Sequence, residues 1–466
     1  MTMEPLSSHV LMTQLNAQDA PEDAQAEAAA EAPRKAELNQ QLSQLESELG
    51  KYKDSAPEAA NLMLQLSDEY YKHGRALGLV RITQRFTQVH VNHPKHREMM
   101  LKLIDAQQVL SRNNELVVAC RQYLERYGAS GEAALIEIRL ADALEQTTDR
   151  EGAAKAAEVV WKRHGNSAIG KQYVERAVYI YQSLPGNELQ TQAAALSEEA
   201  MEKIPAKEFA RAMGNNAVYL YSRLSKRVES NRVINRLFQK GLAGDSDQQR
   251  VSYLQMAANY EQLQQYTNAA NMYQRARQIR DDADTIYKQA MNVYNSKTNP
   301  GQTESLLNQF KQKFSTDERK WTLQQYVALQ YYNAMNNAKA LQLLREGLQG
   351  DAVTHNAASL FITLNGTEPA RLQDTERVFR DAINKSKRAD SRARLYRYLA
   401  FNIYTGEAFN QNRALQLCRE FLSRYPDGSG DTNVMIDYLF KNSPDDNAFR
   451  NDVRMGVGIQ KKISGT

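Results

Sequence analysis

Hydrophobic residues recur every three or four positions along most of the chain, which is the spacing of one buried face on an α-helix. The stretches "EAALIEIRLADALEQ" and "RVINRLFQKGL" show this period, and no convincing run alternates hydrophobic and polar residues as a strand would. Proline, which interrupts helices, is absent between positions 94 and 185 and between 205 and 300. Short polar clusters with glycine, such as "HGNS" and "NPGQ", separate the hydrophobic stretches. The pattern therefore predicts an all-α protein with helices of roughly 12–16 residues joined by short turns.

The sequence also repeats itself at a regular interval. A shift of 34 residues places Tyr253 on Tyr287, and a shift of 40 places "AVYIYQSL" (177–184) on "AVYLYSRL" (217–224). Intervals of this size correspond to one pair of helices per unit. A span from residue 60 to 427 would then hold about ten such pairs.

One stretch, residues 252–279, carries tyrosine and alanine at set places within the repeat. In order along the chain, these places hold Tyr253, Met256, Ala257, Tyr260, Tyr266, Ala269, Tyr273 and Ala276. The arrangement resembles the tetratricopeptide repeat, in which small residues let two helices approach and aromatic side chains fill the remaining gaps. The resemblance implies an extended right-handed solenoid of stacked helix pairs, because one pair cannot bury its hydrophobic face alone.

Composition divides the chain into four parts. Residues 1–33 contain six acidic residues and no Lys or Arg, which favours a disordered acidic tail. Leucines at helical spacing predict a leading helix within residues 34–59. Residues 60–427 form the expected tetratricopeptide-like solenoid. Residues 428–466 are expected to supply capping helices, at "TNVMIDYLF" and "DNAFRNDVRM", and a tail.

Charge and hydropathy set broad limits on partner and compartment. The net charge is +4 and residues 1–33 carry −6, so the remainder carries +10, which could favour an acidic partner. Mean hydropathy is −0.65, and no run approaches the ~18 apolar residues of a membrane span. The start, "MTMEPLSSHVLMTQLNAQDAP", lacks the basic and apolar regions of a signal peptide. We therefore expect a cytoplasmic protein, with the periplasm or cell envelope as the alternative if an upstream signal is missing.

Three histidines, His90, His93 and His96, lie within seven residues in "HVNHPKH" and are the best metal candidates in the chain. Structural zinc sites usually add cysteine or use more widely spaced ligands, and Pro94 places these histidines on a turn. The simpler interpretation is the end of one helix, a turn and the start of the next.

Two cysteines, Cys120 and Cys418, occupy the same place in matched repeats, where other units hold Tyr273 and Leu344. That place packs between helices, where a free cysteine acts as a small hydrophobic side chain. The sequence has no phosphate-binding loop, no G-x-S-x-G elbow, no H-E-x-x-H motif and no C-x-x-C motif. We therefore expect a protein that is not an enzyme and holds no cofactor or metal.

A basic stretch, residues 371–397, holds nine Lys or Arg and four acidic residues, with Tyr396 beside them. Such a stretch could follow a nucleic-acid backbone, so nucleic-acid binding stays open as an alternative function. The simpler interpretation is a solvated helix end and turn. A third function is a scaffold for bacterial cell-envelope assembly, because "REFLSRYPDG" (419–428) resembles repeats of such proteins in this superfamily.

The resemblance implies an adaptor for protein interactions within a multi-protein complex, with the partner in a groove lined by the first helix of each pair. By motif register, the groove positions are Leu254, Ala258, Glu261, Lys288, Asn292, Asn295, Gln325, Leu329 and Tyr332. The family's clamp for a terminal carboxylate uses Lys, Asn and Arg at such places, and here only Lys288 and Asn292 fit it. A less charged peptide, held by asparagine amides and by Tyr332, fits better. The candidate partner-binding residues are Lys288, Asn292, Asn295, Gln325 and Tyr332.

Overall fold

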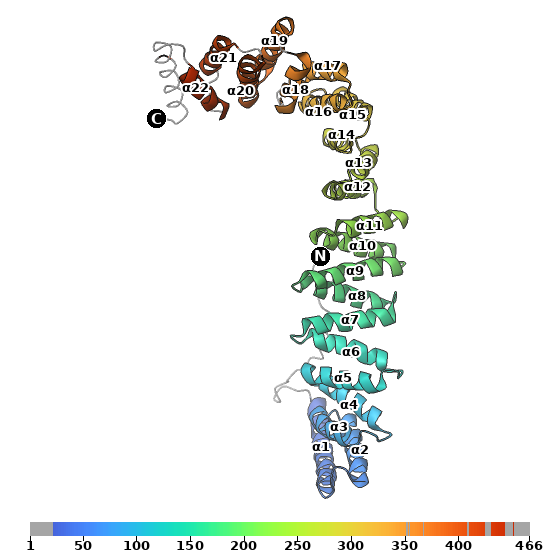
Figure 1. Ribbon diagram of the computed structural model, residues 1–466. Helices are drawn as coiled ribbons and strands as arrows, with labels where there is room; N and C mark the ends of the chain where they lie inside the picture. Colours follow the sequence, from blue (N-terminus) through green and yellow to red (C-terminus); the bar gives the residue numbers. More distant parts are fainter. Residues whose placement is uncertain are drawn as a thin grey trace. The chain divides into compact units, whose positions relative to one another are not determined.

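The structure is a computed structural model that describes residues 22–442 and Asn451, except residues 351–352, 354, 367, 408–409 and 425–429. Every regular element in this described part is a helix (Figure 1), so the all-α class predicted from the sequence is confirmed. The chain divides into two compact units, Met1–Met213 and Gly214–Thr466. Within the described ranges, no helix combines the length and the hydropathy that crossing a bilayer requires.

The first unit contains nine complete helices and the beginning of a tenth. These are α1 (Glu22–Leu49), α2 (Pro57–Lys72), α3 (Ala76–Val89), α4 (His96–Val109), α5 (Asn113–Tyr127), α6 (Ala133–Glu145), α7 (Arg150–His164), α8 (Ala168–Ser183) and α9 (Asn187–Lys203), followed by α10 (Lys207–Arg223), which crosses the boundary.

The second unit continues with helices of similar length. They are α11 (Arg227–Gln239), α12 (Ser246–Gln262), α13 (Tyr266–Ile279), α14 (Ala283–Asn295), α15 (Pro300–Lys313), α16 (Arg319–Asn333), α17 (Asn337–Gly347), α18 (His355–Asn365), α19 (Pro369–Lys385), α20 (Ala389–Arg397), the π-helix η1 (Tyr398–Glu407), α21 (Gln411–Arg424) and α22 (Gly430–Asn442).

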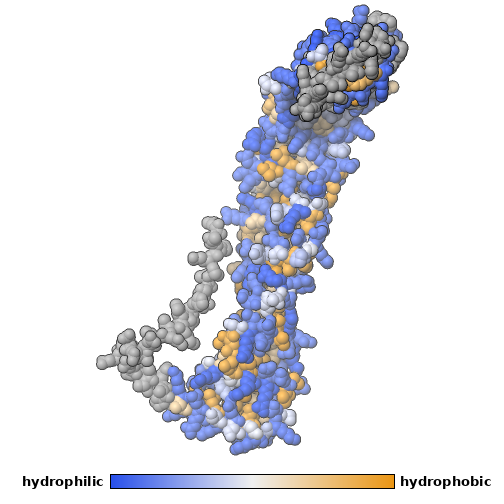
Figure 2. Space-filling model, turned by 90° about the vertical axis from the view of Figure 1, so that its left-hand side faces the viewer, coloured by the Kyte–Doolittle hydropathy of each residue, from blue (hydrophilic) through white to orange (hydrophobic). Residues whose placement is uncertain are grey.

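Within each unit, the extensive contacts join helices that are neighbours in chain order or next but one. In the described part, helices α2 to α21, with η1 continuing α20, make ten successive pairs, in agreement with the repeat spacing. Ala257, Ala269 and Ala276 are completely buried in the pair α12–α13, and Tyr273 is buried with them. These small side chains let the two helices approach closely, as the repeat motif requires. On the face drawn in Figure 2, hydrophobic residues form separate patches among hydrophilic ones.

The turn between the two helices of a pair has a recurring geometry. A residue in the left-handed region follows the first helix, and the next backbone N–H returns to a carbonyl five residues earlier, which is the Schellman arrangement. Five turns share this geometry, with left-handed residues Gly74, Ser111, Ser225, Gln264 and Met335. The corresponding backbone N–H to carbonyl bonds, 2.8–3.0 Å long, run from Arg75 to Tyr70, Arg112 to Gln107, Lys226 to Tyr221, Gln265 to Tyr260 and Asn336 to Tyr331. Four of these five turns use a residue other than glycine, although left-handed backbone costs such residues roughly 1–2 kcal/mol.

Tyrosine–glutamate hydrogen bonds join helix pairs, or α1 and the first pair, at four places in the described part of the chain. In each case, a tyrosine on a first helix, or on η1, donates its hydroxyl to a glutamate of the helix that ends the preceding pair. The bonds are Tyr70 to Glu46, Tyr181 to Glu158, Tyr331 to Glu304 and Tyr404 to Glu376. Because Glu46 belongs to α1, the leading helix packs on the first pair in the manner of another second helix.

The ends of the chain differ from the expected boundaries at one place. Helix α1 begins at Glu22 and continues through Pro33, so residues 22–33, expected as part of a disordered tail, are helical. Their Ala/Glu-rich sequence has high helix propensity. Helix α22 covers "TNVMIDYLF", whereas residues 1–21 and "DNAFRNDVRM" lie outside the described residues, except Asn451.

Candidate functional site

The predicted groove positions on α14 divide into exposed and buried side chains. Lys288 and Asn295 are exposed. Asn292 is only 2% exposed, and its Nδ2 donates to Glu261 Oε1 (2.6 Å) on α12 and to the Lys288 carbonyl (2.8 Å). Asn292 therefore links α14 to α12, the first helices of two successive pairs. A ligand on this surface would contact the exposed Lys288 and Asn295 instead.

The predicted positions on α16 divide in the same way. Gln325 is fully buried, and its Nε2 donates to the Gly347 carbonyl (3.0 Å) at the end of α17. A Cβ at Gly347 would lie 3.1 Å from Gln325 Cγ, so the glycine makes room for this contact. Tyr332, at the end of α16, is 36% exposed. Of the five candidate residues, Lys288, Asn295 and Tyr332 are accessible, while Asn292 and Gln325 serve packing. Of the remaining groove positions, Ala258 is exposed and Leu254, Glu261 and Leu329 are half-buried.

A cavity lies where α14 and α16 end, and it includes one of the candidate residues. Its volume is about 530 Å³, and its lining residues are Tyr294, Asn295, Lys297, Thr298, Asn299, Pro300, Gln330, Asn333 and Ala334. The next residue, Met335, is 86% exposed, the highest value for a large hydrophobic side chain in the described part of the chain. We call this cavity the α14–α16 pocket, and we include in the name Tyr332 and Met335, which flank the lining residues Asn333 and Ala334 in the chain.

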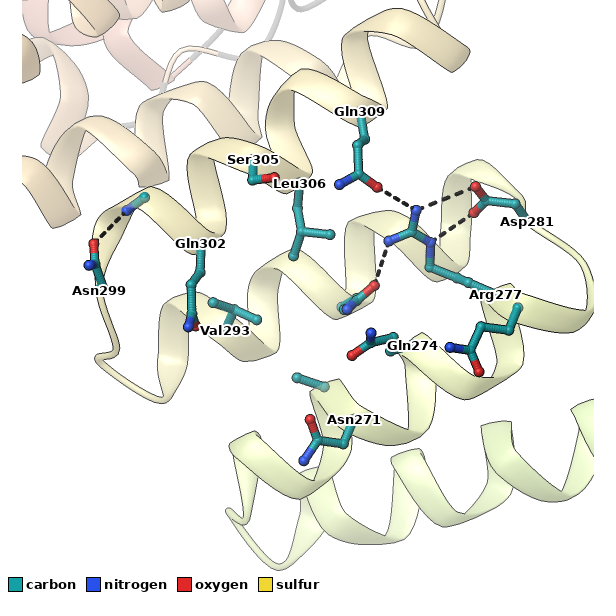
Figure 3. Close-up of a pocket in the computed structure, with 14 residues that line it drawn as sticks. Asn271, Gln274, Arg277, Asp281, Val293, Asn299, Gln302, Ser305, Leu306 and Gln309 are labelled. Atoms are coloured by element: carbon teal, nitrogen blue, oxygen red, sulfur yellow. Dashed lines mark hydrogen bonds and ion pairs between the residues drawn. The ribbon is translucent and has the colours of Figure 1, made fainter.

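A second cavity opens between the second helices α13 and α15, with α14 as its floor (Figure 3), and has a volume of about 680 Å³. Along α13, its lining includes Asn271, Gln274 and Gln278, and along α15 it includes Gln302, Ser305 and Gln309. Both sets have the spacing i, i+3, i+7, which puts each on one helix face. We call this cavity the amide groove. None of its lining residues is among the candidate positions predicted from the sequence, although the spacing of Asn271, Gln274 and Gln278 and that of Gln302 and Gln309 can be read from the chain.

Arg277 lies at one end of the amide groove and connects three helices. Its guanidinium donates to Asp281 (Nε to Oδ1, 2.8 Å), to Gln289 Oε1 on α14 (2.6 Å) and to Gln309 Oε1 on α15 (2.8 Å). Lys313 also contacts Asp281 (2.6 Å). Burial alone would raise the pKa of Asp281, but hydrogen bonds from Arg277 and Lys313 outweigh it and lower that pKa. Arg277 and Asp281 therefore compensate each other's charge within the groove.

Several basic side chains of the stretch 371–397 are held by contacts within the protein. Arg380 lies between Glu376 (2.7 Å) and Glu420 (2.9 Å), and Arg394 donates to the Val353 carbonyl (2.7 Å). The guanidinium of Arg345, together with that of Arg377, holds the pKa of Asp374 well below its usual range. These contacts support the structural interpretation of the stretch and weaken the case for a nucleic-acid site.

The histidine cluster forms a helix end, a turn and a helix start, as the simpler interpretation predicts: α3 ends at Val89 and α4 begins at His96. His96 is buried and hydrogen-bonds through Nδ1 to Tyr127 Oη (2.8 Å) and through Nε2 to the Thr87 carbonyl (3.1 Å). Burial lowers its pKa. Among the residues with described positions, no group of three or more His, Cys, Asp or Glu side chains is arranged to hold a metal ion.

Neither cysteine forms a disulfide, and both are fully buried. Burial raises the pKa of the Cys120 thiol to about 12, which makes this group an unreactive packing side chain at neutral pH. The predicted interhelix position of both cysteines is confirmed.

Comparisons with known proteins add nothing to the fold described above. No family model matches the chain, and no curated protein does. The paired helices, with small residues buried where the motif places them, decide the architecture. The chain is an all-α array of paired helices, and its buried small residues resemble those of a tetratricopeptide repeat. The yeast Tom70 crystal structure is 14% identical over 96% of this chain and 100% of its own, with a TM-score of 0.29. A structure of Naa15/Naa10 bound to HypK-THB is 11% identical over 92% of this chain and 71% of its own, with a TM-score of 0.27. Similarity at this level carries no inference about function.

Proposed function

We propose that the protein is a non-enzymatic adaptor that binds a segment of a partner protein at the α14–α16 pocket. Met335 carries this proposal. The Met335 side chain is 86% exposed. Contact of its apolar surface with water is unfavourable, and a partner that buries this surface would gain the corresponding free energy. The neighbouring Tyr332 supplies an aromatic surface with a polar tip, a residue type enriched in protein interfaces.

The place of Met335 in the fold strengthens the argument. The equivalent left-handed turn positions hold Gly74, Ser111, Ser225 and Gln264, which are glycine or polar residues suited to solvent. A methionine gains nothing from this backbone conformation, and its side chain does not contribute to the buried core. Methionine is unbranched and polarizable, so it adapts to varied partner surfaces.

The candidate residues then take two roles. Lys288, Asn295 and Tyr332 would contact the partner, while Asn292 and Gln325 would keep α12, α14, α16 and α17 in the geometry that presents them. A partner segment of low charge suits this surface, since two lysines, Lys288 and Lys297, are the charged residues among the candidate and lining residues. Membership of a multi-protein complex and a cytoplasmic location remain predictions from the sequence.

Photo-cross-linking tests the proposal. A photoreactive phenylalanine at Tyr332 is compared with the same residue at Tyr179, which is 63% exposed on α8 in the other unit. In nuclease-treated native extract, position 332 should give a discrete cross-linked protein and position 179 should not. The double change Tyr332→Ala and Met335→Ala should reduce capture strongly, because each lost anchor weakens binding by ~1–2 kcal/mol. Capture that persists in the double variant, or that requires nucleic acid, would contradict the proposal.

A further inference from the structure

We propose that the amide groove is a separate binding site for an extended peptide segment, which is recognised through its main chain. The groove lies on the side of the second helices α13 and α15, and its residues are distinct from those of the α14–α16 pocket except Asn299. The inference therefore goes beyond the proposed adaptor site.

The first observation is a set of exposed amides without internal partners. Asn271, Gln274, Gln278 and Gln302 are exposed, and their side chains form no hydrogen bond within the described part of the chain. Each amide offers two donors and one acceptor oxygen. A peptide main chain presents the same groups in alternation along its length, so such amides bind it without requiring particular side chains.

The second observation is that some of the amides are oriented in advance. Arg277 donates to the Oε1 atoms of Gln289 and Gln309, so the acceptor end of each side chain faces the guanidinium. The Nε2 groups of both glutamines form no hydrogen bond in the described structure and are left as donors. Figure 3 shows Gln309 turned toward Arg277 from α15, with Asn271 and Gln274 on the opposite wall. Two fixed donors at this end suit the carbonyl oxygens of a bound peptide.

The dimensions match a short extended segment. Positions i and i+7 on a helix are about 10.5 Å apart along its axis, which equals about three residues of an extended chain. Each wall of the groove therefore follows about three peptide residues. The cavity volume of about 680 Å³ lies within the usual range for binding sites. Val293 on the floor and Leu306 on the α15 wall supply apolar surface for small side chains that point inward.

The lining argues against other polar polymers. It contains no aromatic side chain on which a base could stack. Among the lining residues, Arg277 is the one cation, and it pairs with Asp281, so the lining offers no row of positive charges for a phosphate backbone. A neutral main chain with both donors and acceptors is the ligand that this lining complements.

The first unit supplies a matched control. A cavity of about 730 Å³ lies between α3 and α5 over α4, with glutamines at Gln84, Gln88 and Gln122. These correspond by helix position to Gln274, Gln278 and Gln309. The control cavity is also lined by the charged residues Glu115, Glu125 and Arg126. The charged residues that line the amide groove are one pair of opposite sign, Arg277 and Asp281.

The experiment pans a random dodecapeptide phage library on the full-length protein and measures the affinity of the enriched peptides, made synthetically. The groove variant carries Asn271→Ala, Gln274→Ala and Gln302→Ala. These exposed side chains have no internal partner, and alanine favours the helix, so the variant should fold normally by circular dichroism. The control variant carries Gln84→Ala, Gln88→Ala and Gln122→Ala.

We expect each removed amide to weaken peptide binding roughly fivefold, and the groove variant roughly a hundredfold, with no change in the control variant. N-methylation of alternate peptide bonds should weaken binding at least tenfold, while alanine scanning of the peptide should change it less than N-methylation does. The proposal is overturned if no peptide is enriched, if the groove variant binds as well as the wild type, or if N-methylation has no effect. A further result would also overturn it: no peptide binds, but a single-stranded oligonucleotide or an oligosaccharide does, and the groove variant abolishes that binding. Tyr332 and Met335 are unchanged throughout, so failure here leaves the adaptor proposal standing.

Discussion

Replacing Glu158 by glutamine should destabilise the array around α7, α8 and α9. The Glu158 carboxylate is 16% exposed and accepts hydrogen bonds from Tyr181 Oη (3.0 Å) and Gln192 Nε2 (2.8 Å). Lys162 adds an ion pair (2.7 Å) along α7. Converting two bonds to a charged acceptor into neutral ones costs about 1 kcal/mol each. Loss of the i, i+4 pair with Lys162 adds ~0.3–0.5 kcal/mol. The free energy of unfolding should fall by about 2 kcal/mol.

Trp161 is the natural reporter for this change, because it is buried on the same helix. Urea unfolding is followed by tryptophan fluorescence in a Trp321→Phe background, so that only this region is observed. Glu151→Gln on the same helix is the matched control, since Glu151 pairs with exposed Lys155 at the surface and should cost less than ~0.5 kcal/mol. If Glu158→Gln costs no more than this control, the tyrosine–glutamate bonds do not stabilise the junctions between pairs.

The pH dependence of the same variant tests the electrostatic part of the argument. Burial alone would raise the pKa of Glu158, but hydrogen bonds from Lys162, Gln192 and Tyr181 outweigh it and hold that pKa below its usual value. A carboxylate with a lowered folded-state pKa stabilises the fold above its unfolded pKa, which is near 4.5. This contribution is lost as the pH falls through the folded-state value. The stability difference between wild type and Glu158→Gln should therefore be constant near neutral pH and shrink below about pH 4.5. A difference that grows on acidification would reverse the assigned sign.

Three further changes have distinct expected outcomes. Ala269→Trp should lower the melting temperature, because overpacking a completely buried alanine costs ~1–3 kcal/mol or more; an unchanged melting temperature would place the repeat register elsewhere. Met335→Gly should raise the unfolding free energy in urea by up to about 1 kcal/mol by relieving left-handed backbone, while reducing partner capture; unaltered capture would remove Met335 from the interface. Arg277→Ala should destabilise α13–α15 by about 2–3 kcal/mol through its lost hydrogen bonds, measured by amide hydrogen exchange in those helices; unchanged exchange would contradict its role in joining them.

The architecture can be predicted well from the sequence because the residues that determine how two helices of a pair pack lie close together in the chain. Alanine at 257, 269 and 276 marks where two helices cross, whatever the rest of the chain contains. The shared position of Cys120 and Cys418 is readable for the same reason. The exposure of polar groove residues is harder to predict from the sequence, because it depends on which residues of the neighbouring helices face them. Asn292 is buried because Glu261 is within its reach, and Gln325 is buried because Gly347 leaves room.

Left-handed turns at Ser111, Ser225 and Gln264 could not be predicted either. Their side chains do not favour this conformation, so the helices on both sides must impose it. A left-handed turn can be predicted from the sequence where a glycine occupies it, as at Gly74. Where the packing of the flanking helices imposes the turn on another residue, the local sequence gives no signal.

The restriction of helix contacts to neighbours in the chain has a consequence for synthesis on the ribosome. Because contacting residues are close in sequence, the contact order within each unit is low, and such topologies fold rapidly. A helix pair can bury its small residues against the preceding pair as soon as it leaves the exit tunnel, without waiting for the C-terminal helices. Helix α1, bonded to α2 through Glu46 and Tyr70, would cover the first pair from the beginning, so the nascent chain exposes only its newest hydrophobic face at any moment.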